Sequence, residues 1–146
     1  AVFVLNSVAM GEGSRLLPVY SVETPEKKVA VTFNCAWGAE DIPEILAVLE
    51  KYEAKATFFI LGQWAKENPT AVEMIAKAGH EIGTHSNTHP DMAKISEEKV
   101  AEELLQSCKS IEKSGGGKTN LFRAPSGSYS SGLIKKAAEM GFTTIQ

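Results

Sequence analysis

The sequence predicts an α/β protein in which parallel strands form an open sheet or a barrel. Short segments rich in β-branched and aromatic residues alternate with segments whose apolar residues recur at helical spacing. In such an alternation each helix carries the chain back, so that successive strands run parallel. A length of 146 residues is enough for one domain with a sizeable core.

Runs of apolar and β-branched residues mark the expected strands. They cover residues 28–33, 56–61, 80–84 and 121–125, and a further strand begins at residue 142. Residues 1–27 mix short apolar pieces with turn residues, and we expect an N-terminal strap or hairpin there. Residues 28–146 then form the domain itself, which we expect to be incomplete at its C-terminus because the last strand is only beginning at Gln146.

The segments between the strands predict four helices, each with a recognisable beginning or end. Pro43 suits the first turn of the first helix, and Asn68 followed by a proline suits the start of the second. Ser96 caps a long third helix that carries acidic residues in its first turn and ends at three consecutive glycines. Gly141 ends the fourth helix.

Composition excludes some classes of function. The net charge of −3 and the pI near 5.7 give no general electrostatic case for binding nucleic acid. No apolar run approaches the roughly 20 residues needed to span a bilayer, and the run from Ala1 to Leu5 is too short for the core of a signal peptide. Cys35 and Cys108 could form a disulfide, but we favour free thiols because a domain of this size does not depend on a cross-link.

The most informative short segment contains two of the three histidines. His85 and His89 lie four residues apart, directly after the third expected strand and before Pro90. Neutral imidazole is a common ligand of zinc and similar metals, so this pair is a candidate metal site. The alternative is a pair of loop histidines that only form hydrogen bonds. Two other loops, residues 34–40 and 123–129, are expected at the same edge of the sheet.

Three motifs together resemble the polysaccharide deacetylase family, carbohydrate esterase family four. They are His-Ser-Asn-Thr-His-Pro at 85–90, Phe-Arg-Ala-Pro-Ser-Gly-Ser-Tyr at 122–129, and Thr32-Phe33 followed by Trp37-Gly38. Residues 16–22 and 36–38 also look like the sporulation-associated members of endospore-forming bacteria. The resemblance implies a distorted (β/α) barrel that removes acetyl groups from chitin-like or peptidoglycan sugars. It also implies a divalent metal, zinc before others, held by an aspartate and two histidines, with a second aspartate as general base.

The resemblance assigns roles to residues of two loops. His85 and His89 match the metal-binding histidines, and Ser86 would fix their loop by hydrogen bonding. Arg123 matches the arginine that orients the catalytic aspartate, and Tyr129 matches the residue whose backbone N–H helps to hold the oxyanion. Each role has a plainer alternative: Ser86 could be an ordinary turn serine, Arg123 could be a surface arginine, and the side chain of Tyr129 could pack against its neighbours or stack on a sugar ring.

The first family motif, Thr-Phe-Asp-Asp-Gly, is altered here. Asn34 stands at the position of the general base, and an amide has no useful proton affinity at neutral pH. Cys35 stands at the position of the metal-binding aspartate, where a thiolate could bind zinc or a thiol could simply be a small buried hydrophobe. Glu40 or Asp41 could curl back to replace a carboxylate, although Asp41 suits the start of a helix.

A second departure concerns the end of the family pattern. Its Leu-x-His motif, which carries the acid histidine, has no counterpart before Gln146. We therefore expect either that the chain continues or that the general acid is missing. An incomplete barrel would expose a strand edge through which the protein could associate with another chain.

These observations predict a hydrolase of the polysaccharide deacetylase type, acting on the acetamido C–N bonds of cell-wall or chitin-like glycan, with activity impaired by Asn34 and Cys35. The alternative is a catalytically inactive glycan-binding or structural protein of the spore or envelope. The expected partner is an N-acetylated polysaccharide such as peptidoglycan or a chitin-like oligomer, and the expected cofactor is a divalent metal, with zinc as the first candidate. The resemblance places the protein at the cell envelope, outside the cell or on the spore of a bacterium.

Overall fold

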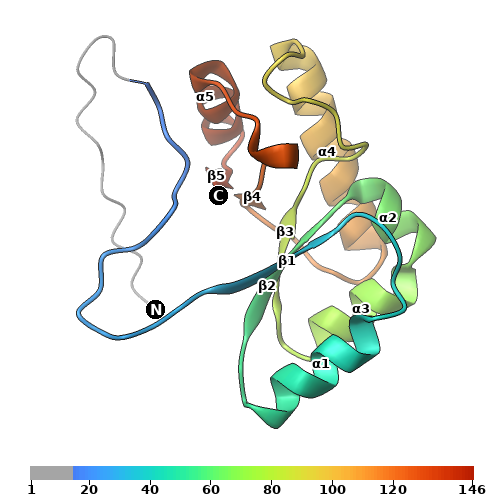
Figure 1. The fold of residues 1–146 in the computed structure, drawn as a ribbon. Helices are drawn as coiled ribbons and strands as arrows, with labels where there is room; N and C mark the ends of the chain where they lie inside the picture. The colour runs from blue at the N-terminus through green and yellow to red at the C-terminus, as the bar shows by residue number, and fades with distance from the viewer. Residues whose placement is uncertain (1–14) are drawn as a thin grey trace.

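Across residues 15–146, which the computed structural model describes, five parallel strands form one sheet in the order in which they occur in the chain (Figure 1). The strands are β1 (Val31–Cys35), β2 (Ala56–Ile60), β3 (Glu81–Thr84), β4 (Leu121–Phe122) and β5 (Thr143–Thr144). This confirms the predicted parallel α/β fold. Because each strand pairs with the next one along the chain, the sheet winds as in a (β/α) barrel and not as in a doubly wound sheet, where the order reverses.

Along the chain, each of the described helices lies between two consecutive strands. They are α1 (Ile42–Lys51), α2 (Gly62–Glu67), α3 (Pro69–Lys77), α4 (Glu97–Lys113) and α5 (Ser131–Glu139), with a short 3-10 turn at Pro125–Gly127. Figure 1 shows α1 to α4 gathered along one side of the strands, with the extended segment that precedes β1 on the other side. Four of these helices were expected, and α2 was not. Its six residues are too few to display a helical repeat of apolar residues, and no side chain caps its beginning.

The first strand begins later than expected. The sequence predicts a strand from residue 28, but β1 starts at Val31, where it pairs with Ala56, the first residue of β2. Within the part of the chain that the structure describes, residues 28–30 pair with no strand, and Val29 is 91% exposed. The apolar run is therefore longer than the ladder that pairs with it.

Two clusters of buried side chains stabilise the described part of the chain. The larger cluster lies between the first three strands and α1 to α3, and it includes Phe58, Trp64, Ile75 and Cys35. The smaller cluster lies under α4 and α5 and includes Leu104, Phe122 and Leu133. The thiols of Cys35 and Cys108 are both free. No helix within residues 15–146 is long and apolar enough to cross a membrane.

The predicted N-terminal strap falls partly outside the described residues, since residues 1–14 are not described. The part that follows pairs with the far edge of the sheet. Val19 forms a parallel bridge with Ile145; its N–H donates to the carbonyl of Thr144 at 2.8 Å, and its carbonyl accepts from Gln146 at 2.9 Å. The outer side of β5 is therefore covered at this point by the chain's own N-terminal segment.

Candidate functional site

Arg123 connects β4 to β1, two strands that are not neighbours in the sheet. It follows β4, and its Nη1 donates to Thr32 Oγ1 at 2.9 Å and to Asn34 Oδ1 at 3.2 Å, both on β1. Thr32 and Asn34 are two residues apart, so they face the same side of the sheet. The guanidinium carbon lies 4.1 Å from the centre of the Phe59 ring, which lets the planar cation stack on an aromatic face. The structure thus brings Arg123 to the position predicted for the general base.

His85 follows β3 and is almost completely buried, with 2% of its surface exposed. Its Nδ1 lies 2.8 Å from the carbonyl oxygen of Arg123. Since a carbonyl only accepts hydrogen bonds, Nδ1 carries the proton and Nε2 keeps a free lone pair. Burial lowers the pKa of His85 to about 4, so the imidazole is neutral at neutral pH. A neutral ring with its second nitrogen bound to a backbone carbonyl is the usual state of a histidine that binds a metal.

His89 is held close to His85 by an unusual loop. The two ring centres are 5.3 Å apart, and the ring of Trp37 lies 6.0 Å from that of His89. Ser86 and His89 both have positive φ angles, 72° and 63°, which side chains other than glycine rarely adopt. The Ser86 hydroxyl accepts a hydrogen bond from the His89 N–H at 3.1 Å, so this serine closes the loop as the resemblance implied.

Cys35 lies apart from the histidine pair. Successive side chains of a strand face opposite sides, and Cys35, unlike the exposed Asn34, packs in the larger core cluster with residues of α1. Burial raises the pKa of its thiol to about 12, so the metal-binding thiolate is disfavoured. Within residues 15–146 no three His, Cys, Asp or Glu side chains gather closely enough to hold a metal ion. The described residues therefore supply two imidazoles and do not fit a complete three-ligand site.

The remaining predicted residues lie near the same edge of the sheet. The hydroxyl of Tyr129 pairs with that of Tyr20 at 3.0 Å, and the Arg15 guanidinium lies 5.0 Å from the Tyr129 ring. An oxyanion role for its backbone N–H stays a prediction. Asp41 occupies the N-cap position of α1 without a capping hydrogen bond. The carboxylate of Glu40 folds back beside Gly38.

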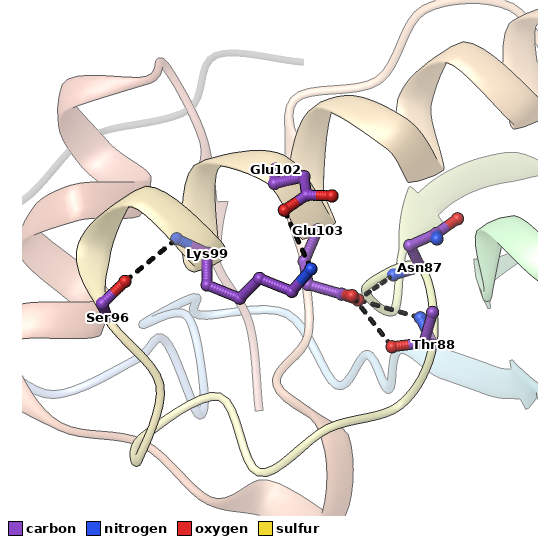
Figure 2. Close-up of polar contacts among 6 residues, drawn as sticks. All are labelled: Asn87, Thr88, Ser96, Lys99, Glu102 and Glu103. Atoms are coloured by element: carbon purple, nitrogen blue, oxygen red, sulfur yellow. Dashed lines mark hydrogen bonds and ion pairs between the residues drawn. The ribbon is translucent and has the colours of Figure 1, made fainter.

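Two buried residues that support the site were not found from the sequence. Trp64 of α2 donates its indole N–H to the carbonyls of Trp37 and Gly38, at 2.9 and 2.7 Å, and so anchors the loop after β1. Glu103 of α4 accepts hydrogen bonds from the loop between the two histidines, as Figure 2 shows. The sequence does contain a hint of Glu103, because it lies beside Leu104 on the apolar side of its helix. A carboxylate buried there needs hydrogen-bond partners.

The chain is similar to known proteins in sequence and in fold. The family model described as "Polysaccharide deacetylase" matches residues 21–145. The chain is 40% identical over 128 residues to the protein YlxY of Bacillus subtilis (strain 168), a match that covers 88% of this chain and 40% of YlxY. It is 35% identical over 126 residues to a peptidoglycan-N-acetylglucosamine deacetylase of Bacillus cereus, covering 86% of this chain and 59% of that protein. The chain thus spans about half the length of these relatives.

Solved structures share the fold as well. A CE4 family pseudoenzyme from Bacillus anthracis is 38% identical to the chain with a TM-score of 0.85, and the match covers 89% of this chain and 46% of that one. A mutant of a CE4 family pseudoenzyme with restored enzymatic activity has the same identity and TM-score, with coverage of 89% and 48%.

Proposed function

The chain belongs to the polysaccharide deacetylase family, and from that premise we propose that it is directed at N-acetylated cell-wall glycan while its deacetylase activity is impaired. The observation that carries the proposal is the hydrogen bond from Arg123 to the amide oxygen of Asn34, at 3.2 Å. At this position the family motif has an aspartate, which takes a proton from the attacking water. Asn34 accepts the hydrogen bond but cannot accept that proton, so the general base is missing.

The relatives support both halves of the proposal. The Bacillus cereus relative is named as a peptidoglycan-N-acetylglucosamine deacetylase, and the Bacillus anthracis structure is named as a pseudoenzyme. We therefore take peptidoglycan or a chitin-like oligomer as the ligand and its acetamido C–N bond as the bond that an active member would hydrolyse. The second candidate function, an inactive glycan-binding or structural protein of the spore or envelope, is favoured by the altered pair Asn34 and Cys35.

For the metal, we propose that His85 and His89 bind a divalent ion, with zinc as the first candidate, more weakly than a three-ligand site would. The neutral ring and free Nε2 of His85 support this role. Ligation by Cys35 stays a prediction, and the burial and raised pKa of its thiol oppose it. Because the described residues do not complete a ligand set, we assign no step of the reaction to the metal.

A zinc titration tests the histidine pair. We expect calorimetry to detect zinc binding by the wild-type protein, loss of that binding in His85→Ala, and no change in His80→Ala. His80 is a suitable control because it lies at the opposite end of β3, with its Nδ1 within 3.4 Å of the Ala56 N–H. Equal zinc affinity of His85→Ala and wild type would remove the metal site from the proposal.

Acetate release tests the catalytic part of the proposal. The full-length protein is incubated with an acetylated chitooligosaccharide or with peptidoglycan, with zinc supplied. We expect Asn34→Asp to release acetate about 10²–10⁴ times faster than wild type, because this is the typical contribution of a general base. Asn34→Gln is the control, since it changes the side chain without adding a base. Asn34→Asp combined with Cys35→Asp restores both carboxylates of the family motif.

The outcomes separate the two candidate functions. Wild-type release at the rate of the Asn34→Asp variant would show that activity is not impaired and would overturn the proposal. The other outcome is that neither Asn34→Asp nor the double variant with Cys35→Asp releases acetate, while the wild-type protein binds the oligosaccharide in a titration. The inactive glycan-binding function is then the correct one.

Localisation and partners follow from the same relatives. We propose that the protein acts at the bacterial cell envelope, outside the cell or on the spore, since its named relatives act on peptidoglycan. We also propose the outer edge of β1 as a surface for association with another chain. Among residues 15–146 that edge has no strand beside it, and unpaired strand edges readily pair with other chains.

A further inference from the structure

Glu103 is a buried carboxylate that lies outside all the family motifs of this chain. It is on α4 and is only 3% exposed. Its Oε2 accepts hydrogen bonds from the backbone N–H groups of Asn87 and Thr88, each at 2.8 Å, and its Oε1 accepts from the Thr88 hydroxyl at 2.8 Å. In Figure 2 the side chain points from the helix directly into the loop that joins His85 to His89.

A second helix holds the same loop from its carbonyl side. The first two N–H groups of α2, from Gly62 and Gln63, donate to the carbonyls of Ser86 and Asn87 at 3.0 and 3.1 Å. Glu103 binds the N–H groups of the loop, while α2 binds its C=O groups. The backbone between the histidines is therefore held between two helices.

The loop needs such external contacts because its own conformation is unfavourable. Ser86 and His89 both occupy the left-handed region of φ, which is costly for residues with a side chain and persists only where surrounding contacts impose it. The Ser86 hydroxyl supplies one contact inside the loop. Glu103 supplies contacts from outside the loop, two to backbone N–H groups and one to the Thr88 hydroxyl.

We propose that Glu103 is a positioning residue, which holds residues 85–89 in the conformation that brings the two imidazole rings together. The inference rests on the proposed function only in that it concerns the same histidine pair. The backbone N–H groups of Asn87 and Thr88 both require an accepting oxygen at Oε2, whereas the Thr88 hydroxyl can donate or accept. A glutamine at this position keeps one accepting oxygen but loses the negative charge. It would thus replace charge-assisted hydrogen bonds with neutral ones, which are roughly half as strong, at nearly unchanged volume.

The test compares Glu103→Gln with Glu102→Gln in the full-length protein labelled at histidine. Glu102 is the matched control, since it is the preceding residue of the same helix and, among residues 15–146, its carboxylate pairs with the exposed Lys99 and not with the loop. We expect Glu103→Gln to shift the ring resonances of His85 and His89 and to speed amide exchange at Asn87 and Thr88 at least about tenfold. The ring resonances of His80, at the other end of β3, should stay in place. Glu102→Gln should change none of these signals.

A purely structural role gives a different result. If Glu103→Gln changes the signals of all three histidines together, or changes none of them, the positioning role is overturned. Should this variant fail to fold, Thr88→Val replaces it, because it removes one hydroxyl and leaves the carboxylate in place. Shifted His89 signals with an unchanged unfolding midpoint then support the inference, and unchanged His89 signals overturn it. These readouts need neither glycan nor metal, so failure here is distinct from failure of the proposed function.

Discussion

Asn34 and Cys35 are neighbours in the chain but differ in almost every physical respect. Asn34 is exposed and reaches Arg123, whereas Cys35 is buried in the core with a pKa raised to about 12. A substitution at position 34 therefore affects mainly the chemistry of the candidate site and not the packing of the core. A change to aspartate at position 35 would also place a carboxylate at a buried position, which is unfavourable unless the side chain finds a partner.

His85 gives a prediction for the dependence of stability on pH. Its pKa is lowered to about 4 by burial, so between pH 4 and 6.5 the unfolded chain binds more protons than the folded one. This contribution to the free energy of unfolding is complete above pH 6.5. As the pH falls toward 4, stability decreases by on the order of 3 kcal/mol. Urea unfolding at a series of pH values, with a chelator present, measures the effect.

The comparison for that experiment is His85→Gln, which keeps an N–H donor for the Arg123 carbonyl but does not titrate. The difference in stability between wild type and variant should change across this pH range. Parallel curves from pH 4 to 7 would show that His85 takes up its proton equally easily in both states, contrary to the prediction.

At the scale of elements, the junction of α2, α4 and the histidine loop tolerates no extra volume. A Cβ at Gly62 would meet the side-chain oxygen of Asn87 and come within 2.7 Å of the Ser107 Cα. We expect Gly62→Ala to lower stability by about 1–3 kcal/mol, as overpacking does. Thermal or urea unfolding measures this.

Gly132 is the matched control. It lies in α5, where an added Cβ would meet, among the described residues, just the Ser130 hydroxyl oxygen at 3.8 Å. Gly132→Ala should be neutral or stabilising by roughly 0.5–1 kcal/mol, because alanine is favoured over glycine inside a helix. Equal effects of the two substitutions would contradict the tight junction.

Neighbouring leucines of α4 test the orientation of that helix. Leu104 is fully buried in the smaller core cluster, whereas the side chain of Leu105 is 61% exposed. Leu104→Ala should lower the free energy of unfolding by about 2–5 kcal/mol, and Leu105→Ala should change it by less than about 0.5 kcal/mol. A larger loss for Leu105→Ala would mean that the helix is turned the other way.

Elements whose apolar residues recur at helical or strand spacing could be predicted from the sequence, and elements without such spacing could not. Val100, Leu104 and Ile111 mark α4 by their spacing and are all buried. By contrast, α2 is shorter than two full turns, and the start of β1 depends on where β2 begins. Glu103 was missed for a related reason. Spacing predicts that a position is buried, but it does not predict that a carboxylate there has a loop to bind.

At the scale of the whole molecule, the meeting of the three strand-end loops could be predicted because parallel strands end at one edge of a sheet. Arg123 accordingly lies beside Asn34, and its carbonyl binds His85, although these residues are far apart in the chain. The side to which each side chain points was harder to predict. It depends on the exact register of β1, and this decides that Asn34 and not Cys35 faces the arginine.

The pairing of the N-terminal segment with the far edge of the sheet has a consequence for the order of folding. Leu16 hydrogen-bonds to Ser131 across 115 residues of sequence, and Val19 pairs with Ile145. Contacts between distant residues form late, since a long loop must close first. During synthesis the segment around Val19 leaves the ribosome well before its partner strand exists. This segment can therefore dock only after Ile145 has been made, so β1 to β4 have the opportunity to assemble before it pairs with the sheet.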